Sequence, residues 1–173
     1  MPVDLIRGRG ANRNTPPPRC NLMERQTEGE WLDSVEALDG VAKRRTTVTI
    51  EHPKTILTRN KSPDIGFDRS VNAYRGCEHG CIYCFARPSH AFHDLSPGVD
   101  FESRLFVKPK AAQLLHATLS RAGYQCAPIA LGTNTDPYQP IEERWRVTRS
   151  LVELLVEARH PFTITTKSDR VLG

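Results

Sequence analysis

The spacing of apolar residues changes repeatedly between residues 46 and 167, and each change marks a predicted secondary-structure element. Short apolar runs, most of them rich in β-branched residues, are typical of strands. Such runs predict strands at residues 46–51, 54–58, 67–77, 100–108, 128–132 and 161–167. Polar and glycine-containing stretches separate them, as expected for strands that are joined by turns.

Two longer segments have apolar residues at the spacing of a helix. The first is residues 109–122, where Pro109 suits the first position of a helix and Gly123 suits the residue after its end. The second carries an apolar stripe at Ile141, Trp145, Thr148, Val152 and Leu155. A stripe of this kind predicts a helix with one side packed against a core.

Strands and helices alternate in the second half of the chain, and this order is typical of a parallel α/β sheet or barrel. Functional residues in such folds lie at the carboxyl ends of the strands. Three distinctive stretches follow predicted strands here, at residues 77–84, 133–139 and 166–168. The sequence therefore predicts that residues with a chemical role lie in these stretches.

Residues 1–45 contain a proline triplet and scattered arginines but little apolar periodicity. Such a composition predicts a largely extended or disordered segment. The folded part is therefore expected at residues 46–173.

The composition limits the class of protein. A chain of 173 residues, 38% hydrophobic and 25% charged, is typical of one globular domain. The net charge of +4 is spread thinly, so its distribution does not support nucleic acid as a partner. The five cysteines are an odd number and no apolar run is long enough for a membrane span, which predicts a cytoplasmic protein.

The stretch CEHGCIYC places three cysteines in a C-x3-C-x2-C arrangement. Gly76 and Gly80 loosen the backbone there, so that Cys77, Cys81 and Cys84 can converge on one centre. Three thiolates are one ligand short of a four-coordinate site. In a reducing compartment, clustered cysteines indicate a metal, a cluster or redox chemistry.

Spacing alone favours two interpretations of these cysteines equally. The first is a structural zinc ion, with His79, His90 or His93 as the fourth ligand. The second is an iron–sulfur cluster with one open iron. We expect all three histidines to lie exposed in loops.

The wider string VNAYRGCEHGCIYCFARP, at residues 71–88, resembles the cluster loop of radical S-adenosylmethionine (radical SAM) enzymes, and more closely that of their spore photolyase-like branch. The segments GRGA, at 8–11, and TDPYQPIE, at 135–142, are similar to a bacterial subgroup of that branch. The resemblance runs from about residue 46 to the end of the chain. It implies a partial parallel (β/α) radical SAM barrel with only the first three βα units, preceded by the extended N-terminal segment.

The resemblance also implies the cofactors. A 4Fe-4S cluster would be held by Cys77, Cys81 and Cys84, and its open iron would chelate the amino and carboxylate groups of S-adenosylmethionine (SAM). An electron from an external donor would cleave SAM to a 5′-deoxyadenosyl radical, which abstracts hydrogen from a substrate that the sequence does not identify. The protein's part in such chemistry is to bind, orient and exclude solvent.

Three further residues are implied as SAM contacts. Tyr83 would support the adenine, Thr135 would hydrogen-bond the SAM carboxylate or amine, and Lys167 would pair with the carboxylate from a buried position. Tyr83 also has a plain packing interpretation, and Thr135 that of a turn or N-cap residue. Asp136 is expected to cap the second helix.

Two departures from the pattern limit the resemblance. Spore photolyases have a hydrogen-donor cysteine where this chain has Thr133, whose O–H bond is too strong for that role, so repair of thymine photoproducts is not expected. A radical SAM core usually has six βα units, whereas this chain ends after the third strand. We therefore expect a separate C-terminal half or self-association at the exposed strand edge. A zinc-stabilised binding module and an iron–sulfur electron carrier are the alternatives to an enzyme.

Overall fold

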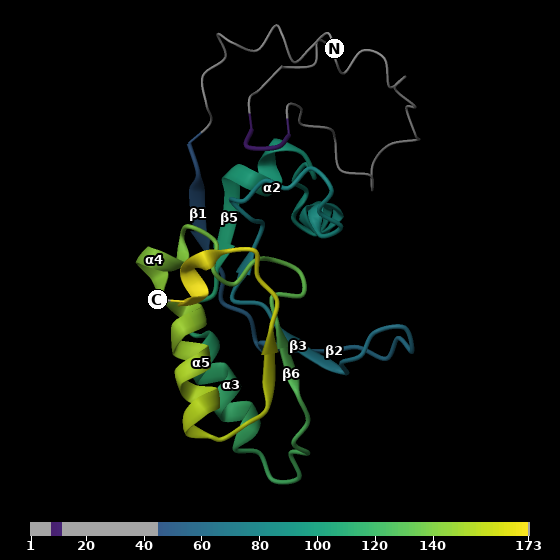
Figure 1. The fold of residues 1–173 in the computed structure, drawn as a ribbon, viewed down its shortest axis with the longest axis vertical. Helices are drawn as coiled ribbons and strands as arrows, with labels where there is room; N and C mark the ends of the chain where they lie inside the picture. Colours follow the sequence, from purple (N-terminus) through teal and green to yellow (C-terminus); the bar gives the residue numbers. More distant parts are fainter. Residues whose placement is uncertain (1–7, 12–44, 173) are drawn as a thin grey trace, which may run out of the picture. The chain divides into compact units, whose positions relative to one another are not determined.

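The computed structural model describes residues 8–11 and 45–172, which form a mixed α/β fold with two small sheets (Figure 1). The described chain divides into two compact units. The first unit contains Gly76–Leu105 together with the described residues before Thr49, and the second contains Thr49–Arg75 and the residues from Phe106 onward. Most of the predicted extended segment at 1–45 lies outside the described residues.

The second unit is built on a four-stranded sheet with the strand order β2-β3-β6-β7. Its strands are β2 (Leu57–Arg59), β3 (Arg69–Val71), β6 (Ile129–Leu131) and β7 (Phe162–Ile164). β3 pairs in parallel with β6, and β6 in parallel with β7, whereas β2 is antiparallel to β3. The predicted succession of parallel strands is confirmed, and the described strands form an open sheet and do not close into a barrel.

Two helices provide the apolar cover for this sheet. The helices α3 (Ala111–Leu119) and α5 (Val147–Glu157) lie side by side next to the parallel strands (Figure 1). The fully buried residues include Leu115, Leu151 and Leu155 from the helices and Ile129 and Leu131 from β6. Of the stripe predicted for the second helix, Thr148 and Leu155 are buried and Val152 is half-buried, whereas the buried Leu151 lies outside that stripe. The helix α3 is shorter than the predicted segment 109–122.

The second predicted helix is interrupted. Its apolar stripe is divided between α4 (Glu142–Trp145) and α5, and Arg146 between them has a left-handed backbone with φ of 49°. The carboxylate of Glu142 accepts hydrogen bonds from the backbone N–H groups of Thr148, at 3.1 Å, and Arg149, at 2.9 Å. These two donors belong to the first turn of α5, so Glu142 satisfies groups that a new helix start leaves without partners.

The other sheet has the strand order β1-β5-β4, with β1 (Thr47–Ile50), β5 (Arg104–Val107) and β4 (Tyr74–Arg75). Two of the predicted strands differ from the structure. The single strand predicted at 67–77 is two strands in different sheets, β3 and β4.

The strand predicted at 100–108 is also only partly right, because it begins as the helix α2 (Val99–Ser103). The Ser103 hydroxyl donates to the Val99 carbonyl at 2.7 Å, and the Asp100 carboxylate accepts from the Ser96 N–H at 3.1 Å. Short 3₁₀ helices η1 (Arg87–His93) and η2 (Asp169–Leu172) complete the described elements. None of the described helices is long and apolar enough to cross a membrane.

Candidate functional site

The cysteine loop leaves strand β4 through a left-handed glycine. Gly76 has φ of 72°, and a Cβ atom there would lie 2.7 Å from the Phe101 carbonyl oxygen and 2.9 Å from the His90 ring. Only glycine fits both this conformation and this space. The N–H of Cys77 then donates to the Phe101 carbonyl at 2.9 Å, which fixes the start of the loop.

Successive tight turns carry the loop through the other two cysteines. The backbone N–H of Gly80 donates to Cys77 O at 3.3 Å, that of Cys84 to Cys81 O at 3.2 Å, and that of Arg87 to Cys84 O at 3.3 Å. Cys77 is buried, whereas Cys81 and Cys84 are half-buried. Cys84 packs against the apolar cluster formed by Cys77, Ala86 and Phe101.

The donor chemistry of this loop fits a thiolate-bound metal or cluster, because three cysteines come from one short stretch of turns. In residues 8–11 and 45–172, however, no three His, Cys, Asp or Glu side chains are arranged to hold a metal ion. A metal or cluster on this loop therefore requires the thiol groups to draw together beyond the arrangement seen here.

The histidines near the loop do not lie exposed, contrary to the prediction. His90 is fully buried, its Nε2 lies 2.9 Å from the Arg104 carbonyl oxygen, and its ring meets Phe101 edge to face at 5.2 Å. Burial lowers the pKa of His90 and favours the neutral ring. His79 and His93 are half-buried. The Nε2 of His90 is thus engaged with the backbone and not directed at a metal.

Tyr83 is 81% exposed, so the packing interpretation of its ring does not apply in this structure. Three other large apolar side chains of the same region are also exposed, namely Ile82, Phe85 and Phe92. Tyr83 therefore stays a predicted adenine contact that could be reached from solvent.

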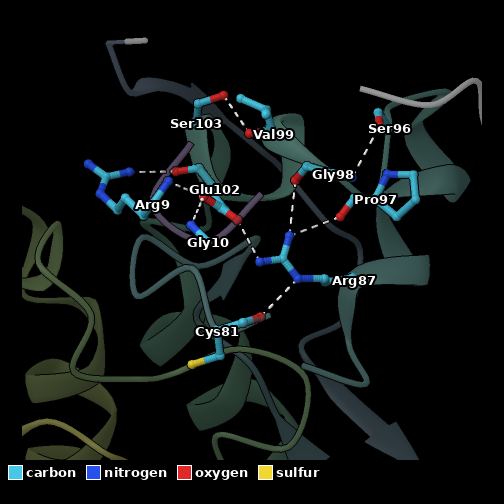
Figure 2. A network of polar contacts seen from close by, with 10 residues as sticks. All are labelled: Arg9, Gly10, Cys81, Arg87, Ser96, Pro97, Gly98, Val99, Glu102 and Ser103. Atoms are coloured by element: carbon cyan, nitrogen blue, oxygen red, sulfur yellow. Dashed lines mark hydrogen bonds and ion pairs between the residues drawn. The ribbon is translucent and has the colours of Figure 1, made fainter. Parts of the chain in front are cut away.

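A network around Glu102 was not anticipated from the sequence (Figure 2). Glu102 is 1% exposed, and its carboxylate accepts hydrogen bonds from the backbone N–H groups of Arg9 and Gly10 and from the Arg87 guanidinium. Arg87 also donates to the Cys81 carbonyl at 2.9 Å. The network connects the GRGA segment with the cysteine loop inside the first unit. The GRGA resemblance was the one sequence signal that could have indicated it.

In the second unit, the loops after β6 and β7 meet at one carboxylate. The Thr166 hydroxyl donates to Asp136 Oδ1 at 2.7 Å, and the Lys167 backbone N–H donates to Asp136 Oδ2 at 2.9 Å. Asp136 also accepts from the Tyr138 N–H at 2.8 Å. The prediction that Asp136 caps the second helix is therefore wrong, because neither α4 nor α5 has a side-chain cap at its N-cap residue.

The two predicted SAM contacts of this unit differ in accessibility. Thr135 is buried, and its hydroxyl accepts a hydrogen bond from the Gln139 amide at 3.1 Å. Lys167 is exposed, not buried as expected. The structure brings the backbones of these two stretches together through Asp136, and the hydroxyl of Thr135 already has a structural partner.

A third strand end joins the same edge of the sheet. Asn72, directly after β3, donates from its side-chain amide to the Thr133 hydroxyl at 3.0 Å and accepts from the Asn134 N–H at 2.9 Å. The carboxyl ends of β3 and β6 are therefore linked by hydrogen bonds of the Asn72 side-chain amide.

A cavity of about 360 Å³ lies beside these residues, and its lining includes Ser70, Asn72, Lys108 and Thr133. Lys108 is 7% exposed, and its Nζ donates to the Asn72 carbonyl at 2.9 Å. Burial and, to a smaller extent, the Arg75 charge lower the pKa of Lys108 to about 8, against the opposing effect of Glu51. No pattern in the sequence indicated that this lysine is buried.

Comparison with known proteins finds relatives without an assigned activity. The chain is 42% identical over 111 residues to the uncharacterized protein Rv2578c of Mycobacterium tuberculosis, covering 62% of this chain and 33% of that protein. The same values hold for the uncharacterized protein Mb2609c of Mycobacterium bovis. The uncharacterized protein MJ0683 of Methanocaldococcus jannaschii is 28% identical over 102 residues, covering 59% of this chain and 36% of that protein.

The chain thus spans about a third of the length of the curated relatives that it matches. No protein-family model matches the chain, and no solved structure matches it. None of the relatives' names states a ligand or a reaction, so the function has to be argued from the residues themselves.

Proposed function

We propose that the chain is a radical SAM iron–sulfur enzyme, or the N-terminal half of one, built as the first part of a parallel (β/α) barrel. The observation that carries this proposal is the cysteine loop, in which three thiols follow a strand on successive turns. Cys77, Cys81 and Cys84 would hold a 4Fe-4S cluster, which supplies the electron that cleaves SAM to a 5′-deoxyadenosyl radical. The substrate and the external electron donor are not identified.

The sheet of the second unit supports the proposal independently. Its strands β3, β6 and β7 are parallel neighbours in the sheet, and α3 and α5 lie in the connections between them. This arrangement is common to open parallel α/β sheets and to the parallel (β/α) barrel that we propose, and in both the functional residues follow the strands. Asp136 holds the loops after β6 and β7 together, which would keep Lys167 near the other polar residues of this edge.

The chain's own residues would have the following parts. Lys167 is exposed and can pair with a carboxylate that arrives from solvent. Tyr83 is exposed in the same way and can stack against an adenine. Thr135 can contribute to SAM binding only if its bond with Gln139 is exchanged or shared, because a hydroxyl both donates and accepts.

Strand β7 has a paired neighbour on one side among the described strands. An edge strand of this kind offers backbone groups to a further strand. The partner that we propose for it is an additional βα unit or a second copy of the chain. Light scattering after size-exclusion chromatography distinguishes self-association from a monomer.

The proposal is tested by anaerobic reconstitution with iron and sulfide, followed by metal analysis and a SAM cleavage assay. We expect about four irons per chain, and 5′-deoxyadenosine as product once a reductant is added. Cys77→Ala, Cys81→Ala and Cys84→Ala should each abolish both signals, whereas Cys126→Ala should not, since Cys126 is exposed and far along the chain. Stoichiometric zinc in the purified protein would instead support a zinc-stabilised binding module, and a cluster without SAM cleavage would support an electron carrier.

A further inference from the structure

We infer that the segment Gly8–Ala11, which we call the brace, holds the backbone of the cysteine loop (residues 77–84) in place. Glu102 and Arg87 are the positioning residues that connect the brace to this loop. The inference concerns the geometry of the loop, and its consequence for a cluster rests on the proposed function. All the residues involved belong to the first unit.

The brace is a tight turn wrapped around a carboxylate. The Gly8 N–H donates to the Ala11 carbonyl at 2.7 Å, which closes the turn. The next two backbone N–H groups, of Arg9 and Gly10, both donate to Glu102 Oε2. Successive N–H groups that point at one anion form a nest, a favourable backbone arrangement for negative charge. Because Glu102 is 1% exposed, its carboxylate depends on these protein donors and not on water.

The same carboxylate reaches the cysteine loop through Arg87. Glu102 Oε1 accepts from Arg87 Nη2 at 2.5 Å, and Arg87 Nε donates to the Cys81 carbonyl at 2.9 Å. The remaining Arg87 nitrogen donates to the carbonyl groups of Pro97 and Gly98, each at 3.1 Å. The guanidinium therefore holds the backbone of Cys81 at a fixed place relative to Glu102 (Figure 2).

The Arg9 side chain adds a second attachment. Its Nη2 donates to Glu78 Oε1 at 3.0 Å and to the Thr46 hydroxyl at 3.0 Å, and its Nη1 donates to the Glu102 carbonyl at 2.8 Å. Glu78 is the residue after Cys77, and it is 7% exposed. The loop is thus contacted at Glu78, directly after its first cysteine, and at Cys81, its second cysteine.

A third attachment is direct contact between two glycine backbones. A Cβ atom on Gly10 would overlap with the Gly80 carbonyl, and one on Gly80 would lie 2.5 Å from Arg9 Cβ. Gly80 also has φ of 63°, which disfavours any other residue. The brace therefore packs on the loop between Cys77 and Cys81 without a side chain in between.

These attachments reduce the freedom of the backbone that carries the thiols. A loop whose backbone is already ordered loses less conformational entropy when its thiol groups draw together around a metal or cluster. Removing the brace should therefore loosen residues 77–84 and weaken the hold on any metal or cluster there. It should leave the sheet of the second unit unaffected.

Two variants test this, each with a matched control. Gly10→Ala introduces the overlap with Gly80, and its control is Gly66→Ala, where a Cβ atom would meet no other atom within 4 Å. Glu102→Gln keeps the shape of the side chain. Its NH₂ group is a donor, however, and must face either the Arg87 guanidinium or the N–H groups of Arg9 and Gly10, so at least one hydrogen bond is lost. Its control is Glu153→Gln, on an exposed i,i+4 pair.

The first measurement is hydrogen exchange of the complete chain before reconstitution. We expect amides in residues 77–84 to exchange about tenfold faster in Glu102→Gln, the factor for losing one hydrogen bond to a charged group. They should also exchange faster in Gly10→Ala, because the overlap with Gly80 displaces the segment Gly8–Ala11. Amides of β6 and both controls should be unchanged. The second measurement is the rate at which a chelator removes iron from reconstituted protein, which should rise by a similar factor, with a shifted EPR spectrum in Glu102→Gln.

Unchanged exchange in residues 77–84 would overturn the inference. Equally faster exchange in the loop and in β6 would also overturn it, since the residues would then serve general stability. If the parent chain binds no iron, the proposed function fails, but the exchange comparison still decides whether Gly8–Ala11 braces the loop.

Discussion

Replacing the buried lysine of the second unit with an apolar residue of similar length should stabilise the protein at neutral pH. Lys108 is 7% exposed, and burial together with the nearby Arg75 charge lowers the pKa of its amino group from 10.5 to about 8. A pKa lower by about 2.5 corresponds to about 3 kcal/mol of cost for keeping the charge in the folded state. Lys108→Met removes that cost.

The gain is reduced by one lost hydrogen bond. Nζ donates to the Asn72 carbonyl at 2.9 Å, and an ordinary bond of this kind contributes about 1 kcal/mol. The variant should therefore be more stable than the parent by about 2 kcal/mol at pH 7, the difference between these two effects.

The sign of the pH dependence follows from proton binding. Between the folded pKa of about 8 and the unfolded value of 10.5, the unfolded state binds more protons at Lys108 than the folded state does. The stability of the parent therefore rises with pH in this window, relative to the variant. Above it, the lysine is neutral in both states, and the variant should be less stable by about 1 kcal/mol.

Urea unfolding of parent and variant across this pH range measures the difference in the free energy of unfolding. Lys61→Met is the matched control, and since Lys61 is exposed, it should change stability by less than about 0.5 kcal/mol. A difference between parent and Lys108→Met that stays constant with pH would refute the reasoning, as would a variant that is destabilised at pH 7.

Three further predictions follow from single side chains. Glu142→Ala should destabilise by about 2–4 kcal/mol in urea unfolding, because it leaves the N–H groups of α5 and the buried Tyr74 hydroxyl without their acceptor; equal stability would contradict this. Asp136→Asn should speed amide exchange after β7 and not in α3, since Asp136 accepts from Lys167 N–H; unchanged exchange would count against that link. Lys167→Ala should keep its iron after reconstitution but bind SAM more weakly, and equal affinity in a titration would remove Lys167 from the site.

The parallel part of the fold could be predicted because it depends on local patterns. The runs around β6 and β7 are short and apolar, and the stripes of α3 and α5 repeat at helical spacing. Connections that contain a helix favour parallel neighbours. The order of elements therefore indicated the parallel strands β6 and β7, whereas it did not show that the strand predicted at 100–108 belongs to the other sheet.

The predictions that were wrong concern places where a side chain makes hydrogen bonds to residues far away in the sequence. Nothing between Ile141 and Leu155 indicates a break, and the hydrogen bonds that Glu142 accepts there come from the start of α5 and from the distant Tyr74. Asp136 was similarly assigned to a helix cap, whereas it joins the ends of two strands. Contacts between residues far apart in sequence leave no periodic pattern.

The candidate site likewise contains some residues that a local pattern reveals and others that come together only in the fold. The three cysteines could be found by spacing, because all of them lie in one loop. The brace could not, since Gly8–Ala11 and Glu102 are separated by about ninety residues and glutamate is usually an exposed residue. Burial of Lys108 and His90 was missed for a related reason, because each acquires its partner only when the strands are assembled.

The most direct test of the proposed function is the EPR spectrum of the reduced, reconstituted chain, recorded without and with SAM. An iron of the cluster that lacks a cysteine ligand would bind SAM, so we predict a cluster signal whose shape changes when SAM is added. The signal should be lost in Cys81→Ala and retained in Cys126→Ala. A spectrum that is identical with and without SAM, or a chain that takes up zinc in place of iron, would contradict the proposal.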